Sequence, residues 1–580
     1  MTANPDAVTE AGIELAVGPG LKCRVLSRNS LSQGSAGVCT AVILGRLRLD
    51  GVDADAAALC QAYAQHSDLQ TLYDRLSGRF FAAIADSRRQ SLHLLPDFMG
   101  LQSCYHTRSG DELLVSDSLS LLKSLPQTSF SISDQSLFDY FYFHCIPSPA
   151  TIYRECAKLA PGTALTFDSN GATQEAVLYR PGFAAKAANL NQLHEQCLAV
   201  IDQAVQRNAG PDCGAFLSGG LDSSTVAGML ARNQAGARTF SIGFESPDYD
   251  ETPYARITAE HFGTAHEVLY LDSSAAADKL ASIARYFEEP FGNSSAMAAY
   301  FCADFARDKG IKTLLAGDGG DELFAGNGHY ARQKQFEVFH KLPNWLRGIL
   351  RMALCNPLAS RLPLLRKGAS YIRQADVPMP DRLGTYNFVQ MYGADRMFDP
   401  AFLERVDAEA PIQAQRRRYR DCRSDNTVDR MLYLDWKFTL ADNDLVKVKK
   451  MCEMAGVDVR FPLLEREVVD FSCQVPAADK IPGFKLRDFY KNACRGFLPD
   501  DTLSKSKHGF GLPFGLWMKE DERLRTLSRD CIAAFRQRNI LSDALIDDAL
   551  KSHEQVHAGY YGELIWIIVI LELWLQQETA

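Results

Sequence analysis

Two short glycine-rich loops carry residues whose types and spacing suit phosphate chemistry. Glycines permit a tight turn and a close approach of the backbone to a ligand. Backbone amides at a helix N-terminus bind anions, and hydroxyl groups add further donors. The first loop follows the apolar segment 214–218, precedes the helix-like run 224–232, and reads Ser218-Gly219-Gly220-Leu221-Asp222-Ser223-Ser224.

An acidic side chain in this loop points to a metal ion. Asp222 would repel a bare phosphate, so it implies a cation between its carboxylate and the phosphates. The loop is neither a Walker A motif nor a G-x-G-x-x-G turn. Read alone, it is also compatible with a glycine-rich turn that only begins a helix.

The second loop, GDGGDELFAG at 317–326, also follows an apolar segment, TLLAG. In a doubly wound fold, ligands bind at the edge formed by the carboxyl ends of the strands. We therefore expect Asp222 and Asp321 to share one Mg²⁺, which prefers oxygen ligands and phosphate. An acidic glycine-rich loop alone is more often a turn, but the pair of loops favours a site.

The elements that must position these loops divide the chain into two predicted domains, 1–185 and 190–580. In the second, short apolar strands alternate with helices, which predicts a parallel, doubly wound α/β sheet. The region 332–430 reads as helical. In the first domain, short alternating runs predict a sheet with hairpins at 38–49, 79–86, 91–97, 112–117 and 164–168.

Composition excludes several classes of protein. The 580 residues are 46% hydrophobic and 23% charged, with a net charge of −9, which is typical of a globular protein without a broad nucleic-acid surface. The 15 Cys include no C-x-x-C pair and predict free thiols. The apolar run 564–571 is too short to span a bilayer and predicts a buried terminal helix. We expect a cytoplasmic protein with no nucleic-acid or membrane partner.

The motifs together resemble the synthetase domain of the asparagine synthetase family, ATP pyrophosphatases of the PP-loop type. The resemblance rests on SGGLDSS, TFSIGF, EEPFGNSSA and GDGGDELFAG, continues through 444–465 and 498–517, and covers residues 190–575 in order. More weakly, 76–106 is similar to the class II glutaminase domain. The resemblance implies an αββα glutaminase-like sandwich followed by a parallel-sheet PP-loop domain with a helical C-terminal part.

The resemblance also implies roles for individual residues. The Ser218–Ser224 loop would bind ATP pyrophosphate, with Mg²⁺ on Asp222 and Asp321. AMP would lie against Ile242 and Gly317. A substrate carboxylate would attack the ATP α-phosphate, and an amine would then capture the acyl-adenylate. The positions of acid, base and substrate-holding groups in the family correspond to Asp318, Asp444 and Lys447.

Three departures from the family pattern matter. Position 2 is Thr2 rather than the Cys of class II glutaminases, and the first Cys is Cys23, so we predict an inactive glutaminase. The family lysine of the K-x-x-L-R pattern aligns with Arg487, or with Lys485 if the register slips. An acidic family residue is replaced by Lys449, which indicates either a different acceptor or drift on a surface helix.

The favoured hypothesis is an ATP-dependent amide-forming ligase that does not hydrolyse glutamine. The expected substrate is a carboxylate, with a precursor peptide supplied by a partner protein as one candidate. Internal closure as in lasso-peptide macrolactam cyclases fits best. Amidation of a small or cell-surface carboxylate with ammonia is the alternative. A tRNA thiolase and a non-catalytic scaffold that binds MgATP are rivals. We expect Trp517, Trp566 and Trp574 to be core residues, and His508 to be a loop residue near the nucleotide.

Overall fold

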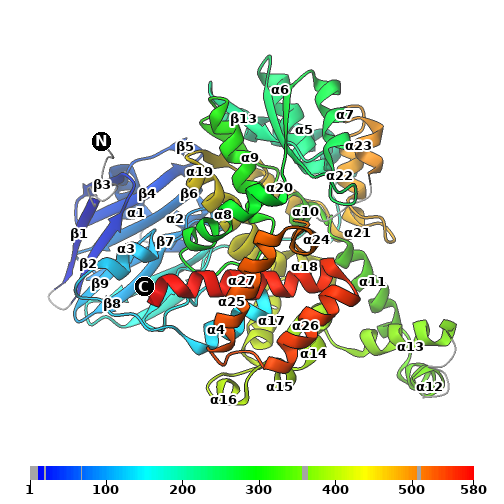
Figure 1. Cartoon of the computed structure of the whole chain (residues 1–580). Coiled ribbons are helices and arrows are strands. Elements are labelled where there is room, and N and C mark those ends of the chain that lie inside the picture. Colours follow the sequence, from blue (N-terminus) through cyan, green and yellow to red (C-terminus); the bar gives the residue numbers. More distant parts are fainter. Residues whose placement is uncertain are drawn as a thin grey trace.

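The computed structural model describes residues 11–18, 21–66, 68–187, 189–355, 363–505 and 511–579. Figure 1 shows a blue N-terminal part built on two sheets, a green part around a third sheet, and a mainly helical remainder. The predicted fold class is confirmed. The domain limits at 185 and 190 stay predictions.

The N-terminal part is a sandwich of two sheets with helices outside. Helix α1 (Ala56–His66) packs on the larger sheet and contacts α2 (Leu69–Asp74). Helix α3 (Leu119–Ser124) packs on the smaller sheet. The smaller sheet has the order β1 (Ala11–Gly18), β2 (Leu21–Ser27), β9 (Glu112–Ser116), β8 (Tyr105–Ser109) and β10 (Cys156–Lys158). The larger runs β12 (Thr173–Val177), β11 (Thr163–Asp168), β7 (Ser91–Pro96), β6 (Leu76–Asp86), β4 (Cys39–Leu49) and β3 (Leu31–Ala36), with β5 (Val52–Asp53) paired to β4.

Alternation along β6 explains why this sheet is buried on both faces. Successive side chains of a strand point to opposite faces. Phe81 and Ala83 join the core between the two sheets, whereas Phe80 and Ala82 join the core under the helices. Cys23 also lies in the core between the sheets, fully buried, and burial raises the pKa of its thiol far above the usual value.

The third sheet places the two glycine-rich loops next to each other. Its five parallel strands have the order β15 (Ala265–Tyr270), β14 (Arg238–Gly243), β13 (Cys213–Phe216), β16 (Thr313–Leu315) and β17 (Asp458–Arg460). The chain moves outward from β13 to β15 and then returns to the other side of β13. Ligands bind at such a switch point, outside the carboxyl ends of the strands. The loops after β13 and β16 both begin there.

Two helical layers accompany this sheet. Helices α5 (Leu190–Asn208), α6 (Leu221–Asn233) and α7 (Thr252–Phe262) pack in succession. The second layer contains α8 (Ser273–Tyr286), α9 (Ala296–Asp308) and α19 (Leu445–Ala455). Glycine 228 on α6 allows close packing, because a Cβ there would lie 2.5 Å from the Phe262 ring.

The helical remainder surrounds one apolar helix, α27 (Ala558–Thr579), drawn in red in Figure 1. It contacts α8, α24 (Phe514–Glu520), α25 (Glu522–Arg536) and α26 (Asp543–Gln555). Its residues 558–578 are long and apolar enough to cross a membrane by composition. Residues 564–571, however, are at most 2% exposed. The predicted buried terminal helix is confirmed, as are the free thiols and the core positions of Trp517, Trp566 and Trp574.

Two buried lysines connect the helical part to the N-terminal sandwich. The Lys449 ammonium donates to the carbonyls of Gly100 and Leu101, both at 2.9 Å. Lys437 donates to the Pro161 carbonyl at 2.8 Å. The expectation of a surface helix is therefore wrong, because Lys449 is only 6% exposed. The expectation of a different acceptor stays a prediction that Lys449 does not support, since its ammonium lies in the interface.

Candidate active site

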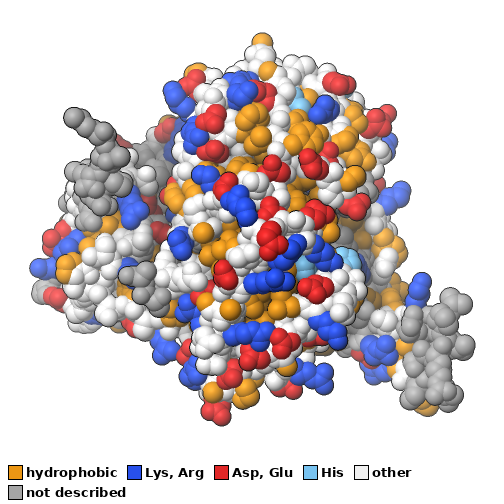
Figure 2. Space-filling view, viewed as in Figure 1, with side chains coloured by type: hydrophobic (Ala, Val, Ile, Leu, Met, Phe, Trp, Pro, Cys, Tyr) orange, Lys and Arg blue, Asp and Glu red, His pale blue; other side chains and the backbone are white. Residues whose placement is uncertain are grey.

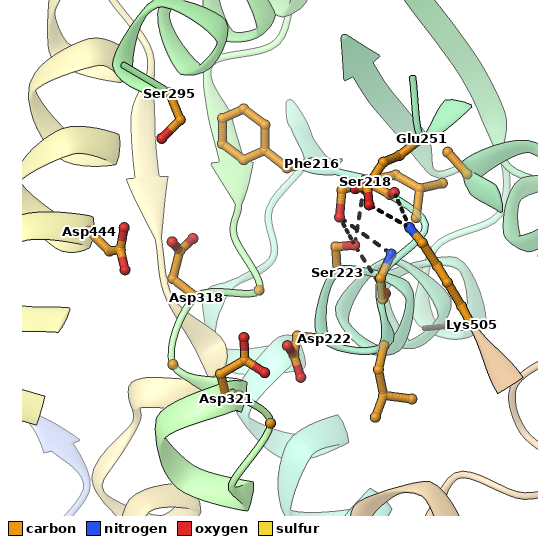
Figure 3. A pocket seen from close by; sticks show the side chains of 18 of the residues that line it. Phe216, Ser218, Asp222, Ser223, Glu251, Ser295, Asp318, Asp321, Asp444 and Lys505 are labelled. Atoms are coloured by element: carbon orange, nitrogen blue, oxygen red, sulfur yellow. Dashed lines mark hydrogen bonds and ion pairs between the residues drawn. The ribbon is translucent and has the colours of Figure 1, made fainter. Parts of the chain in front are cut away.

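The loop after β13 is ordered by its own hydroxyl groups. The Ser218 amide donates to Ser223 Oγ at 3.1 Å, and the two serine hydroxyls lie 3.0 Å apart (Figure 3). Gly219 has a φ of +71°, and a side chain there would collide with the backbone of α7. The helix α6 begins at Leu221 with Gly220 as its N-cap. The amide end of the helix therefore faces the space where an anion would bind.

The loop after β16 contacts the first loop directly. A Cβ on Gly317 would lie 2.6 Å from the Ser223 nitrogen, and one on Gly320 would collide with the Asp222 carboxylate. The second loop leads into α10 (Gly320–Phe324), whose first turn carries Asp321. Glycine is thus required at these positions because the two acidic loops touch.

Arg487 lies between the two acidic side chains. Its Nη2 atom is 3.1 Å from Asp222 Oδ2 and also pairs with Asp321 Oδ1. Arg487 has a φ of 56°, a conformation that costs an L-residue about 1–2 kcal/mol. The paired carboxylates compensate for this strain. Lys485 also lines the cavity, but Arg487 makes the contacts with both carboxylates.

The two carboxylates fit a magnesium ion that completes its shell with phosphate. Asp222 Oδ1 is buried and has no hydrogen-bond partner among the described residues, so it is available as a ligand. No cluster of three or more His, Cys, Asp or Glu suited to a metal occurs in the described ranges. Mg²⁺ is commonly held by one or two carboxylates together with substrate phosphates and water. Asp222 and Asp321 supply the two carboxylates, and substrate phosphates and water would have to supply the remaining ligands.

A second charged group borders the same space. A π-helix, Trp436–Asp444, ends at Asp444 and continues into α19, where Lys447 Nζ lies 2.7 Å from Asp444 Oδ1. Figure 3 shows Asp318 and Asp444 extending toward a common space. Burial, opposed by Lys447 and reinforced by Asp444, raises the pKa of Asp318 to about 6. Asp318 is therefore suited to exchange a proton near neutral pH.

One cavity of about 930 Å³ joins both charged groups. Most of the predicted site residues line it: Ser218, Gly220, Leu221, Asp222, Ser223, Ile242, Gly317, Asp318, Asp321, Asp444, Lys447 and Arg487. Two predicted residues lie behind the lining. Gly219 packs on α7, and the Ser224 hydroxyl lies 3.0 Å from that of Thr258. Thr2 and His508 lie outside the described residues.

The predicted residue set omits Lys505. Its side chain is 6% exposed, with Nζ 3.1 Å from Glu251 Oε1 and 3.4 Å from the Ser218 carbonyl oxygen. It also lies 4.6 Å from the centre of the Tyr254 ring. A cation is thus held against the phosphate-loop backbone (Figure 3). The sequence offered one signal for Lys505, which is its position in the family-like segment 498–517. The basic residues of that segment have no spacing that distinguishes Lys505 from the others.

This arrangement defines a nucleotide-dependent enzyme of the PP-loop type. The family described as asparagine synthase matches residues 196–576, and a glutamine amidotransferase domain matches 51–178. The chain belongs to the asparagine synthase family. Members of this family are ATP-dependent carbon–nitrogen ligases that form AMP and use ATP with Mg²⁺.

Relatives span most of the chain. Asparagine synthetase [glutamine-hydrolyzing] 1 of Bacillus subtilis (strain 168) is 24% identical over 530 residues, covering 90% of this chain and 80% of the relative. A putative asparagine synthetase of Mycobacterium tuberculosis (strain ATCC 25618 / H37Rv) is 26% identical over 542 residues, 90% of this chain and 79% of the relative. A second putative synthetase, from Methanocaldococcus jannaschii, is 29% identical over 401 residues, 66% and 74% of the two chains.

Proposed function

We propose that this protein activates a substrate carboxylate with ATP and joins it to an amine without hydrolysing glutamine itself. The observation that carries the proposal is the single cavity shared by the two acidic glycine-rich loops and the Asp318–Asp444–Lys447 group. A nucleotide and a second substrate fit a cavity of this size, which lies in the upper range of ligand pockets.

The first step is adenylation. A carboxylate oxygen attacks the α-phosphorus of ATP, and the bond from that phosphorus to pyrophosphate breaks. The Ser218–Ser224 loop holds the pyrophosphate through backbone amides and hydroxyls, with Arg487 and Lys505 adding positive charge. Mg²⁺ on Asp222 and Asp321 would neutralise charge that develops on the leaving group. Such fixed charges stabilise a transition state because they need no reorganisation.

The second step is capture of the acyl-adenylate. An amine nitrogen attacks the acyl carbon, the bond to AMP breaks, and the amine loses a proton. Asp318 is the candidate base, because its raised pKa of about 6 leaves it ionised yet basic near neutral pH. In this proposal Lys447, which pairs with Asp444, holds the substrate carboxylate or the adenylate.

The amine source separates two versions of this function. The relatives named above are glutamine-hydrolysing by name, whereas this chain has Thr2 and a buried Cys23. This difference is what favours an amine that arrives with the substrate or from solution.

Internal amide closure, such as macrolactam formation on a precursor peptide, is the favoured version, since a substrate amine needs no glutaminase. Amidation of a carboxylate with free ammonia has equal support from the relatives, which are named as asparagine synthetases.

Pyrophosphate release from MgATP, followed by product mass, tests the proposal. The protein would be incubated with glutamine, with aspartate and ammonia, and with peptides from a cell extract. A product lighter by one water and without added nitrogen would establish internal closure. A loss of about one dalton that requires ammonia would establish primary amidation. If none of these substrates led to pyrophosphate release, the proposed ligase would be contradicted.

The proposed loss of glutaminase activity has its own test. Thr2→Ala should leave every activity unchanged, and glutamate release from glutamine should stay at the rate without protein. Glutamine hydrolysis that depends on Thr2 would show that the N-terminal domain is active after all.

A further inference from the structure

A basic helical projection stands apart from the cavity. It consists of α11 (Gly328–His340), α12 (Asn344–Leu354) and α13 (Pro363–Asp376), and Figure 1 shows α12 and α13 extending away from the body of the molecule. Its small core contains Phe336, Phe339, Ile372 and Ala375. Leu350 and Leu354 of α12 pack against this core.

The rest of the apolar surface of α12 faces outward. Trp345 is 67% exposed, Ile349 51% and Met352 77%, and α12 has no buried residue. Residues at i, i+4 and i+7 lie on one face of a helix. Of the eleven large hydrophobic residues exposed in the described part of the chain, these three and Val338 all fall within 338–352. The exposed apolar surface is therefore concentrated on this projection.

The charge of the projection is opposite to that of the whole protein. Its described residues, 328–355 and 363–376, contain eight Lys and Arg but only two acidic residues, Glu337 and Asp376, whereas the whole chain has a net charge of −9. Arg351 pairs with Asp376, while Lys341, Lys367 and Arg373 are exposed. Figure 2 shows Lys and Arg side chains beside apolar ones near the base of this projection.

We propose that α12 docks the protein on an anionic lipid surface, with Trp345 and Ile349 inserted between the headgroups. A helix with aromatic and aliphatic residues on one face, flanked by Lys and Arg, is the pattern of an interfacial membrane anchor. Tryptophan favours the membrane–water boundary, and basic residues are attracted to anionic lipids. This proposal differs from the sequence expectation of no membrane partner, and it is independent of the proposed reaction.

An acidic peptide is the competing occupant, and the shape of the surface argues against it. Recognition of a peptide usually needs a groove or a sheet edge that surrounds several side chains. Helix α12 extends away from the body of the molecule (Figure 1) and has no buried residue. A bilayer accepts one face of a projecting helix without a groove.

Tryptophan fluorescence provides a specific readout. The protein has five Trp, and the other four, Trp436, Trp517, Trp566 and Trp574, are at most 9% exposed. We would add vesicles of pure phosphatidylcholine, or of about three parts phosphatidylcholine to one part phosphatidylglycerol, to the full-length protein. Only the anionic vesicles should shift the emission to shorter wavelength and retain the protein in flotation, about tenfold more than neutral ones, with loss of binding at high salt.

Variants locate the binding surface. Trp345→Phe should float with anionic vesicles but lose the shift, whereas Ile349→Glu should reduce flotation by about tenfold. Val556→Glu is the matched control, because Val556 is 71% exposed but lies outside the projection. Thermal unfolding of each variant would verify the fold.

Three outcomes would overturn the proposal. They are the absence of binding to anionic vesicles, equal binding to neutral ones, and binding that Ile349→Glu leaves unchanged. Sedimentation velocity without lipid covers one further case: a dimer that Ile349→Glu dissociates would show that a second copy occupies this face instead.

Discussion

Two lysines on α19, two residues apart, have opposite surroundings. Lys447 faces the large cavity and pairs with Asp444 at 2.7 Å. Lys449 faces the N-terminal sandwich and donates to two backbone carbonyls. Successive positions on a helix differ by about 100°, so neighbours on one helix serve different partners. A buried charge marks an active site only where it borders a cavity and meets other charged groups.

The protonation behaviour of the two lysines follows the same division. Burial lowers the pKa of Lys447, but Asp444 and Asp318 outweigh it, and the pKa ends above the usual value. For Lys449, burial lowers the pKa to about 7, although Asp97 lies near enough to oppose it. The first lysine is a permanent cation at the cavity, and the second is a hydrogen-bond donor whose charge is costly to keep.

The metal-binding carboxylates should show the largest effect. Asp222→Asn and Asp321→Asn keep the shape of the loops but weaken the metal site, so we expect pyrophosphate release to fall by about a thousandfold in each. Asp530→Asn on α25, which is exposed, is the matched control and should keep full activity. Normal pyrophosphate release in either loop variant would refute the metal assignment.

Lys447→Met should follow, with product formation reduced by about a hundredfold because a fixed charge beside the adenylate is lost. Asp444, 28% exposed at its side chain, can be solvated by water, whereas buried Asp318 should become harder to ionise without Lys447. Product assays and urea unfolding would be run in parallel with Lys449→Met. If Lys449→Met were the less active of the two when folded, the contrast between these positions would be wrong.

The pH profile should report Asp318. A base with a pKa of about 6 is protonated below that value, so amide formation should fall about tenfold per pH unit below pH 6. The folded protein binds this proton more tightly than the unfolded chain, so lowering the pH from about 6 toward 4 stabilises folding through this group. Loss of activity there is therefore not unfolding caused by Asp318.

Asp318→Asn supplies the control for that profile. The variant should be slow at every pH and should lack the limb near pH 6, while Lys551→Met, exposed on α26, should keep it. A limb near pH 6 that persists in Asp318→Asn would assign the titration to another group.

The sequence predicts which loops form the candidate site better than it predicts the residues that pack around those loops. Asp222 and Asp321 could be placed together because both follow strands of one parallel sheet, and the switch point after β13 makes them neighbours. The contact of Arg487 with both carboxylates could not be predicted, since it depends on a left-handed residue before α22 (Asp488–Ala493). Asp444 ends a π-helix, whose extra residue per turn is invisible to a 3.6-residue pattern.

Lys449 shows why buried contacts between distant parts of the chain could not be predicted from sequence patterns. Helix periodicity indicates that a residue is buried or exposed, but the partner of Lys449 is 348 and 349 positions away in sequence. The carbonyls that it meets are turned inward because Asp97 accepts the amides of Met99, Leu101 and Gln102. A lysine opposite a loop of free carbonyls is favourable, and nothing local to α19 encodes that loop.

The smallest effect should be that of Lys449→Met, and it concerns stability. The carbonyls of Gly100 and Leu101 would lose a buried donor, which costs about 1–3 kcal/mol of unfolding free energy. The lysine of the unfolded chain keeps its proton up to about pH 10, whereas the folded one releases it near pH 7. Because the unfolded chain binds more protons between these values, stability from this group rises with pH across that window. Lys449→Met should therefore flatten the rise measured by urea unfolding at pH 7 and pH 9, while Lys551→Met keeps it; an unchanged slope would mean that the lysine in the interface stays charged.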